Sequence, residues 1–117
     1  MTRNTWYNSV ENDVLTHARR LPVQMDFGIS ADFSVPGAVS RLRLARQIRQ
    51  DMWRLLRGLR GFSPVVQVSV SGGLARVNAG GAIDGVLPAR ARDQLAALLS
   101  NPRKRARWLR HARKADL

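Results

Sequence analysis

Residues 38–60 read AVSRLRLARQIRQDMWRLLRGLR and keep helical spacing throughout. At about 100° per residue, apolar and basic side chains separate onto opposite sides. The apolar positions are Leu44, Ala45, Ile48, Met52, Leu55, Leu56 and Leu59. The basic positions are Arg43, Arg46, Arg49, Arg54, Arg57 and Arg60, and Trp53 lies among them. The stretch predicts a long helix with one face in a core and the other presented to a polyanion.

The positive charge of the chain is concentrated in two segments. The net charge is +12, and residues 37–61 and 101–117 each carry seven basic side chains and one acidic side chain. The remaining residues, 1–36 and 62–100, are together neutral. Such a charge favours polyanionic partners, and arginine, the dominant base here, suits bidentate contact with phosphate. The alternative is a solvated polar face, but such faces usually mix both signs of charge.

A first helix is predicted at residues 8–21. Asn8 and Glu11 have capping-box spacing, and Pro22 would end the helix. The positions that share a face are Val10, Val14, Leu15, Ala18 and Leu21.

Residues 23–35 alternate between apolar and polar side chains, which is typical of strands with one buried face. The apolar set is Val23, Met25, Phe27, Ile29, Ala31, Phe33 and Val35. Because thirteen residues are long for one strand, we expect a strand at 23–29 and a weaker one at 31–35. The alternatives are a hairpin that turns around Gly28 to Ala31 and one strand followed by extended chain.

The second half of the chain predicts a hairpin and then two helices. Residues 65–70 are rich in valine, Ser71-Gly72-Gly73 is a turn signal, and Ala75, Val77 and Ala79 share one side of the segment that follows, which indicates a hairpin at 65–79. A short third strand is expected within 82–87. Helices are predicted at 88–100 and at 102–115, the latter capped by Asn101.

These elements define an α+β fold. A small antiparallel sheet, made of the hairpin 65–79 and strands within 23–35, would pack against the long helix 38–60. An N-terminal helix and two C-terminal helices complete it. Residues 1–117 are predicted to be a single basic domain, and the sequence leaves open whether the C-terminal helix at 102–117 is semi-independent.

The last helix is a second basic element. Its basic side chains recur along one stripe, and a different face carries Trp108, Ala112 and Ala115. Trp53 could either stack on an unpaired base or pack against the N-terminal segment or the sheet. The candidate nucleic-acid-binding residues are Arg43, Arg46, Arg49, Trp53, Arg54, Arg57, Arg60, Arg103, Lys104, Arg107, Arg110 and Lys114.

The sequence offers no catalytic or metal-binding pattern. It has no cysteine, and His17 and His111 lack metal-ligand spacing. Asp26, Asp32 and Asp84 could in principle converge, but nothing in their spacing requires the carboxylate cluster of a two-metal nuclease. We therefore expect neither an enzyme nor a cofactor. A membrane span and a secretory signal are also not expected, which together with the absence of cysteine favours a cytoplasmic protein.

The leading hypothesis is a non-enzymatic nucleic-acid-binding protein. DNA is favoured over RNA because a rigid arginine helix suits a duplex, whereas the stacking aromatics of single-strand RNA readers are scarce. The alternative is a protein-interaction or regulatory adaptor whose basic face meets an acidic partner. The apolar helix faces could equally form a homodimer interface.

Overall fold

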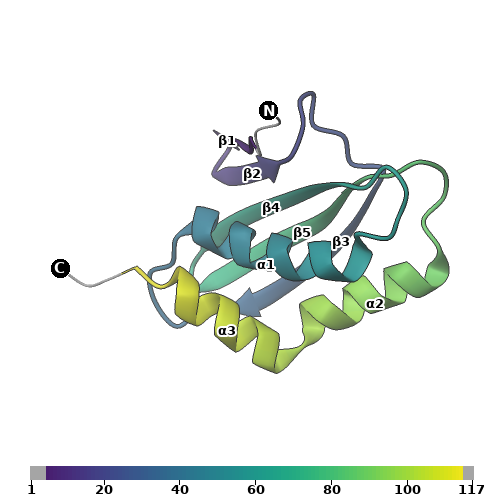
Figure 1. Ribbon diagram of the computed structural model, residues 1–117. Coiled ribbons are helices and arrows are strands. Elements are labelled where there is room, and N and C mark those ends of the chain that lie inside the picture. The colour runs from purple at the N-terminus through teal and green to yellow at the C-terminus, as the bar shows by residue number, and fades with distance from the viewer. Residues whose placement is uncertain (1–4, 115–117) are drawn as a thin grey trace.

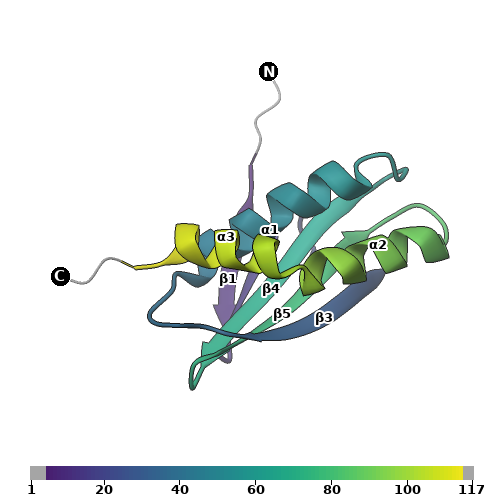
Figure 2. The ribbon, with the colours of Figure 1, turned by 90° about the horizontal axis from the view of Figure 1, so that it is seen from below.

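The computed structural model describes residues 5–114, in which one antiparallel five-stranded sheet is combined with three helices. The spatial order of the strands is β1-β2-β4-β5-β3. All three helices lie on one face of the sheet (Figures 1 and 2). The predicted α+β class is confirmed. In chain order the elements are β1 (Tyr7–Glu11), β2 (Val14–Ala18), β3 (Phe27–Ser34), α1 (Arg41–Leu56), β4 (Ser63–Ser71), β5 (Leu74–Ala82), α2 (Ala89–Ser100) and α3 (Pro102–Ala112).

The predicted N-terminal helix at 8–21 is wrong, because this segment forms the β1–β2 hairpin. Its two-residue turn, Asn12 and Asp13, has φ values of 52° and 64°. Asparagine and aspartate tolerate this left-handed region, and such a turn matches the twist of a hairpin. Val10, assigned to the buried side of a helix, is 56% exposed on the edge strand. The capping-box pattern was therefore coincidental.

Strand β3 is one continuous strand where two, at 23–29 and 31–35, were predicted. It pairs with β5 along its whole length, so no hairpin interrupts it. The predicted alternation is correct within the strand, since Phe27 and Phe33 are buried on the same side, but the strand begins only at Phe27 and Val23 before it is 39% exposed. The two strands approach so closely that any side chain at Gly80 would collide with the backbone of Phe27.

The central β4–β5 hairpin confirms the prediction at 65–79. Gly72 and Gly73 make its turn with φ values of 58° and 74°. The separate third strand predicted within 82–87 is wrong, because β5 itself continues to Ala82 and no strand follows before α2.

Helix α1 is shorter than the predicted 38–60. It begins after Ser40, whose Oγ accepts a hydrogen bond from the Arg43 N–H at 3.2 Å. Val39, just outside, forms an isolated extended bridge with Arg113. The helix ends at Leu56, so Arg57 and Arg60 lie in the turn that leads to β4.

Helices α2 and α3 lie where two C-terminal helices were predicted, and Ala115 lies outside the described residues. Asn101 caps α3 through an Oδ1 that accepts from the Lys104 N–H at 3.1 Å. α3 runs beside α1, and the Ser40 N–H donates to the Ala112 carbonyl at 2.8 Å. Trp108 is fully buried, so α3 is docked on the remainder of the fold.

The two faces of the sheet differ in character. α1 lies mainly over β4 and α2 contacts β3, which encloses the core between helices and strands. The opposite, open face is polar. There the Gln67 amide donates to Thr16 Oγ1 and accepts from the Asn78 amide, each at 3.3 Å.

Candidate nucleic-acid interface

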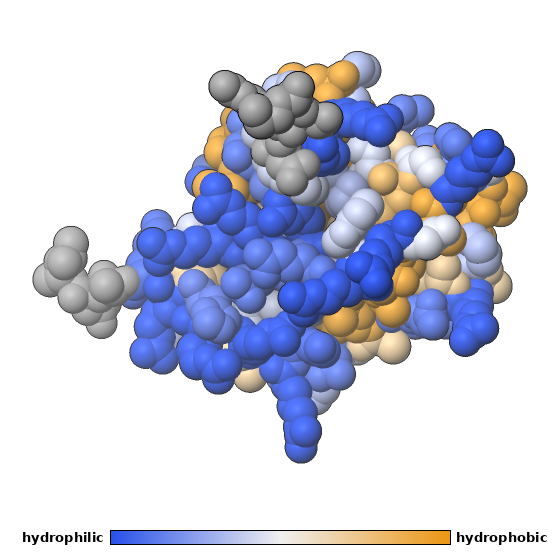
Figure 3. Space-filling view, in the orientation of Figure 1, coloured by the Kyte–Doolittle hydropathy of each residue, from blue (hydrophilic) through white to orange (hydrophobic). Residues whose placement is uncertain are grey.

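The positive charge of the described residues lies chiefly in two adjacent helices. α1 carries five arginines and one aspartate, and α3 carries four arginines and one lysine. The five strands carry only Glu11, Asp32 and Arg76 as charged side chains. Hydrophilic side chains predominate on the surface over α1 and α3, with a few paler and apolar ones between them (Figure 3). The basic helix face, as we call it, consists of Arg43, Arg46, Arg49, Arg54, Arg103, Lys104, Arg107 and Arg110.

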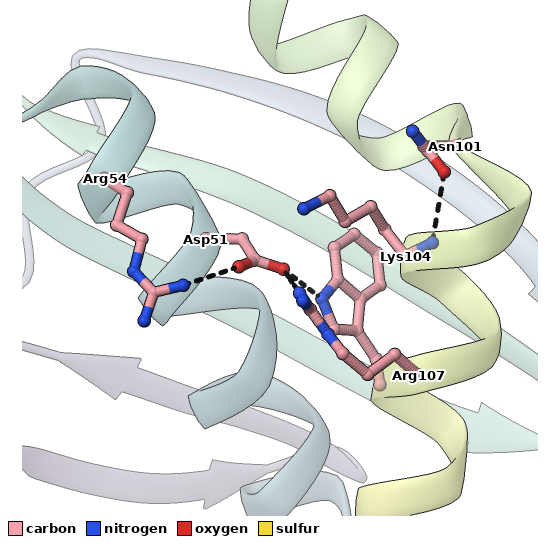
Figure 4. A network of polar contacts seen from close by, with 6 residues as sticks. Asp51, Arg54, Asn101, Lys104 and Arg107 are labelled. Carbon is pink, nitrogen blue, oxygen red and sulfur yellow. Dashed lines mark hydrogen bonds and ion pairs between the residues drawn. The ribbon is translucent and has the colours of Figure 1, made fainter.

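Asp51 joins the two helices. Its carboxylate is only 6% exposed and points from α1 toward α3 (Figure 4). Asp51 Oδ2 accepts hydrogen bonds from Arg107 Nη2 and, at 2.7 Å, from Trp108 Nε1. Arg54 approaches the other carboxylate oxygen at 3.8 Å. The single acid of the long helix therefore fixes α3 beside α1.

Two of the predicted binding residues thus already serve Asp51. The Arg107 side chain is 35% exposed and donates to the buried carboxylate, so it acts mainly as a link between helices. The Arg54 side chain is 74% exposed and its ion pair is long, which leaves most of its donors facing solvent.

The other predicted cations lie mostly on the surface. Arg49 on α1 and Lys104 on α3 are partly buried. The exposed ones are Arg43, Arg46, Arg57, Arg60, Arg103, Arg110 and Lys114. The fold therefore brings cations from both predicted segments to one layer, with the two helices running antiparallel along each other.

Trp53 is packed against the protein on one side and exposed to solvent on another. Its indole stacks on Phe62 with a centroid distance of 5.9 Å and an interplanar angle of 14°. The side chain is nevertheless 44% exposed on the outer side of α1. Because one ring face is against Phe62, the exposed surface belongs to the other face and the ring edge.

A groove of about 450 Å³ lies between the β1–β2 hairpin and the second half of α1. Its principal lining side chains are Trp6, Arg19, Arg20, Arg49, Trp53 and Phe62, and we call it the aromatic groove. The sequence did not reveal Trp6, Arg19 and Arg20 as site residues, because the last two were assigned to a helix end. The Asn12-Asp13 pair, which suits a two-residue hairpin turn, was the signal that could have placed Trp6 and Arg19 at adjacent strand ends.

One wall of the aromatic groove is a stack of rings and a guanidinium. Trp6 stacks on His17 at 4.9 Å, and the Arg49 guanidinium lies 4.0 Å from the Trp6 ring centroid. Burial first, and then the charges of Arg49 and Arg46, lower the pKa of His17 to about 4. The ring is therefore neutral at pH 7, with Nδ1 donating to Asn8 Oδ1 at 2.6 Å.

Burial and the neighbouring charge of Arg46 also lower the pKa of the Arg49 guanidinium. This side chain has lost part of its hydration, so an anion that reaches it displaces less water than at an exposed arginine.

Other kinds of site are not found in the part of the chain that the structure describes. No group of three or more histidine, aspartate or glutamate side chains in residues 5–114 could hold a metal ion. None of the helices in those residues is long and apolar enough to cross a bilayer.

Comparison with protein-family models, with curated proteins and with solved structures finds no match to this chain. The class of protein that the fold itself defines is an α+β protein with a basic helix layer on one face of an antiparallel sheet.

Proposed function

We propose that this protein binds nucleic acid, and duplex DNA in preference to RNA, through the basic helix face. The observation that carries the proposal is that the two arginine-rich helices lie side by side in one layer. Phosphate contacts supply most of the affinity of non-specific nucleic-acid binding, and they need this kind of concentrated charge.

The geometry of the two helices suits a rigid polyanion. Arginines one helical turn apart are about 5.4 Å apart along the axis, which lets them reach neighbouring phosphates. Arg43 and Arg46 line the first half of α1, and Arg110 lies near the end of α3. Because Asp51 holds the helices together, the cations on both are positioned before binding, and less side-chain and helix freedom is lost on association.

We propose no enzymatic step and no cofactor.

The test is the affinity for a fluorescent DNA duplex, measured by anisotropy. Arg43, Arg46 and Arg110, all exposed, are replaced together by glutamate. We expect the affinity to fall by at least about a hundredfold, because three phosphate contacts become repulsive. Circular dichroism should show an unchanged fold.

The matched control reverses three other exposed arginines: Arg76 on the open face, and Arg90 and Arg92 at the start of α2. Both variants have the same net charge, so a general effect of charge would weaken them equally. Equal losses in the two triple variants would overturn the proposed interface.

Salt dependence provides an independent check. If about six phosphates are neutralised, the affinity should fall about a thousandfold between about 50 and 200 mM salt. A flat salt response would sink the proposal of phosphate binding.

A second candidate is a protein-interaction module. Strand β1 is an edge strand whose five residues are all exposed, and Tyr7 and Val10 are 40% and 56% exposed. An exposed edge can pair with another strand, including a second copy of this chain. Light scattering after size exclusion would detect a homodimer, and co-purification of a stoichiometric acidic protein that resists salt would favour an adaptor.

A further inference from the structure

The aromatic groove contains features that duplex phosphate binding does not require. Phosphate contacts need cations, whereas this groove places two tryptophans beside arginines from different segments. Trp6 precedes β1, Arg19 and Arg20 follow β2, and Trp53 lies on α1. The fold thus brings together side chains that are far apart in the sequence.

The exposed part of the Trp53 indole offers a surface on which a planar group could stack. Phe62 supports one face of the indole, and the side chain is 44% exposed. Exposing this much of a tryptophan to water is unfavourable unless a ligand covers it. A nucleobase is such a ligand, because every base has a π-face and stacking on aromatic side chains is tolerant of sequence.

The cations of the groove are held in place by the protein. The Arg49 guanidinium lies over Trp6, and Arg19 Nη1 donates to the Thr5 carbonyl at 2.9 Å. The lining described for the groove contains no carboxylate. Phosphates on either side of a stacked base would therefore meet positive charge, from the exposed Arg20 and the partly buried Arg49.

The groove also continues directly from the basic helix face. Arg46 lies about one turn before Gln50, and Arg57 lies about one turn after Trp53. Gln50 lines the groove and offers an amide donor and acceptor to a base edge. Arg49 belongs both to the basic helix face and to the groove lining, so a strand that leaves a duplex bound on α1 would meet this cation at the groove.

We propose that the aromatic groove takes an unpaired nucleobase of a single-stranded segment that adjoins the bound duplex. The base stacks on Trp53, and Arg20 and Arg49 contact its phosphates. This inference rests on the proposed nucleic-acid binding, and it adds a preference for junctions between duplex and single strand.

The test compares a blunt DNA duplex with the same duplex extended by an oligothymidine overhang. The wild-type protein should bind the extended duplex about tenfold more tightly, as expected for one stacked base. Trp53→Ala should abolish this preference, so that the extended duplex and the blunt duplex bind with equal affinity. Trp53→Phe, which keeps an aromatic face, should retain part of the preference and guards against misfolding of the alanine variant.

A second readout is tryptophan fluorescence. Oligothymidine should quench Trp53 in a Trp6→Phe variant, while Trp108, which is fully buried, serves as an internal reference. Normal binding to the blunt duplex, with no preference for the overhang and no quenching, would overturn this inference alone. Failure to bind either duplex would overturn the proposed function itself.

Discussion

The two faces of the sheet are built from the same strands and yet present opposite surfaces. On β4, Val66 and Val68 point into the core beneath the helices, whereas Gln67 between them belongs to the open face. The helix layer above the core carries the net positive charge, while the open face has the Asp32–Arg76 pair, 3.8 Å apart, whose charges cancel. A polyanion therefore has one side of the molecule to approach, and the charge asymmetry follows from topology rather than from composition.

The largest difference in stability should appear when an aspartate is removed from each face. Asp51→Ala leaves Arg107 and the Trp108 N–H without their shared buried acceptor, so we expect a loss of about 3–5 kcal/mol in the free energy of unfolding. Asp32→Ala breaks an exposed pair and should cost at most about 1 kcal/mol. Urea denaturation followed by circular dichroism measures both values.

Asp51→Asn sharpens this comparison, because the amide keeps an oxygen for Trp108 Nε1 but loses the charge that faces Arg107. Its stability should lie between wild type and Asp51→Ala. Similar small losses for Asp51→Ala and Asp32→Ala would show that Asp51 does not hold α3 on α1.

The sequence predicted the helix layer well because the helical spacing of apolar and basic side chains continues over many residues without interruption. The apolar side of 38–60 matches the buried residues of α1, and Asn101-Pro102 was correctly placed as the start of the last helix. The central hairpin was also predicted, since Gly72 and Gly73 adopt conformations that other residues rarely accept.

The N-terminal hairpin was missed because a five-residue strand gives a short pattern that a helical period can also fit. Val10, Val14 and Leu15 satisfied helical spacing, although the Asn12-Asp13 turn divides them between two strands. This error hid the aromatic groove, since Trp6 and Arg49 meet only when β1 folds back along β2. The role of Asp51 was equally out of reach, because its partners are more than fifty residues away in the sequence.

The helix-covered side also contains a histidine that should make the stability of the protein depend on pH. His17 lies on the helix-covered side, where its folded pKa is about 4 against an ordinary value of 6.5. Below pH 6.5 the unfolded chain binds a proton that the folded chain does not. The free energy of unfolding should therefore fall by up to about 1.4 kcal/mol per pH unit as the pH drops from 6.5 toward 4, and should be fully recovered above pH 6.5.

His17→Phe keeps a ring to stack on Trp6 and removes the titration, so its stability should decline less steeply over this range. Denaturation curves at several pH values measure the slope. His111→Gln, at an exposed position on α3, is the matched control and should follow wild type. Parallel declines in all three proteins would assign the acid sensitivity to the carboxylates instead.

The smallest effect is expected from the open face itself. Gln67→Ala removes the middle of the hydrogen-bonded row from Thr16 to Asn78, at a partly exposed position. Since net contributions of such hydrogen bonds are small, the loss of stability should be about 1 kcal/mol. Affinity for the DNA duplex should not change, because no cation is lost and the helix layer is on the other side. Thr16→Val removes only the end of the row, so its loss of stability should be smaller than that of Gln67→Ala. A loss of affinity in Gln67→Ala comparable to that of the Arg43, Arg46 and Arg110 reversal would place the open face in the interface and end the distinction between the two faces.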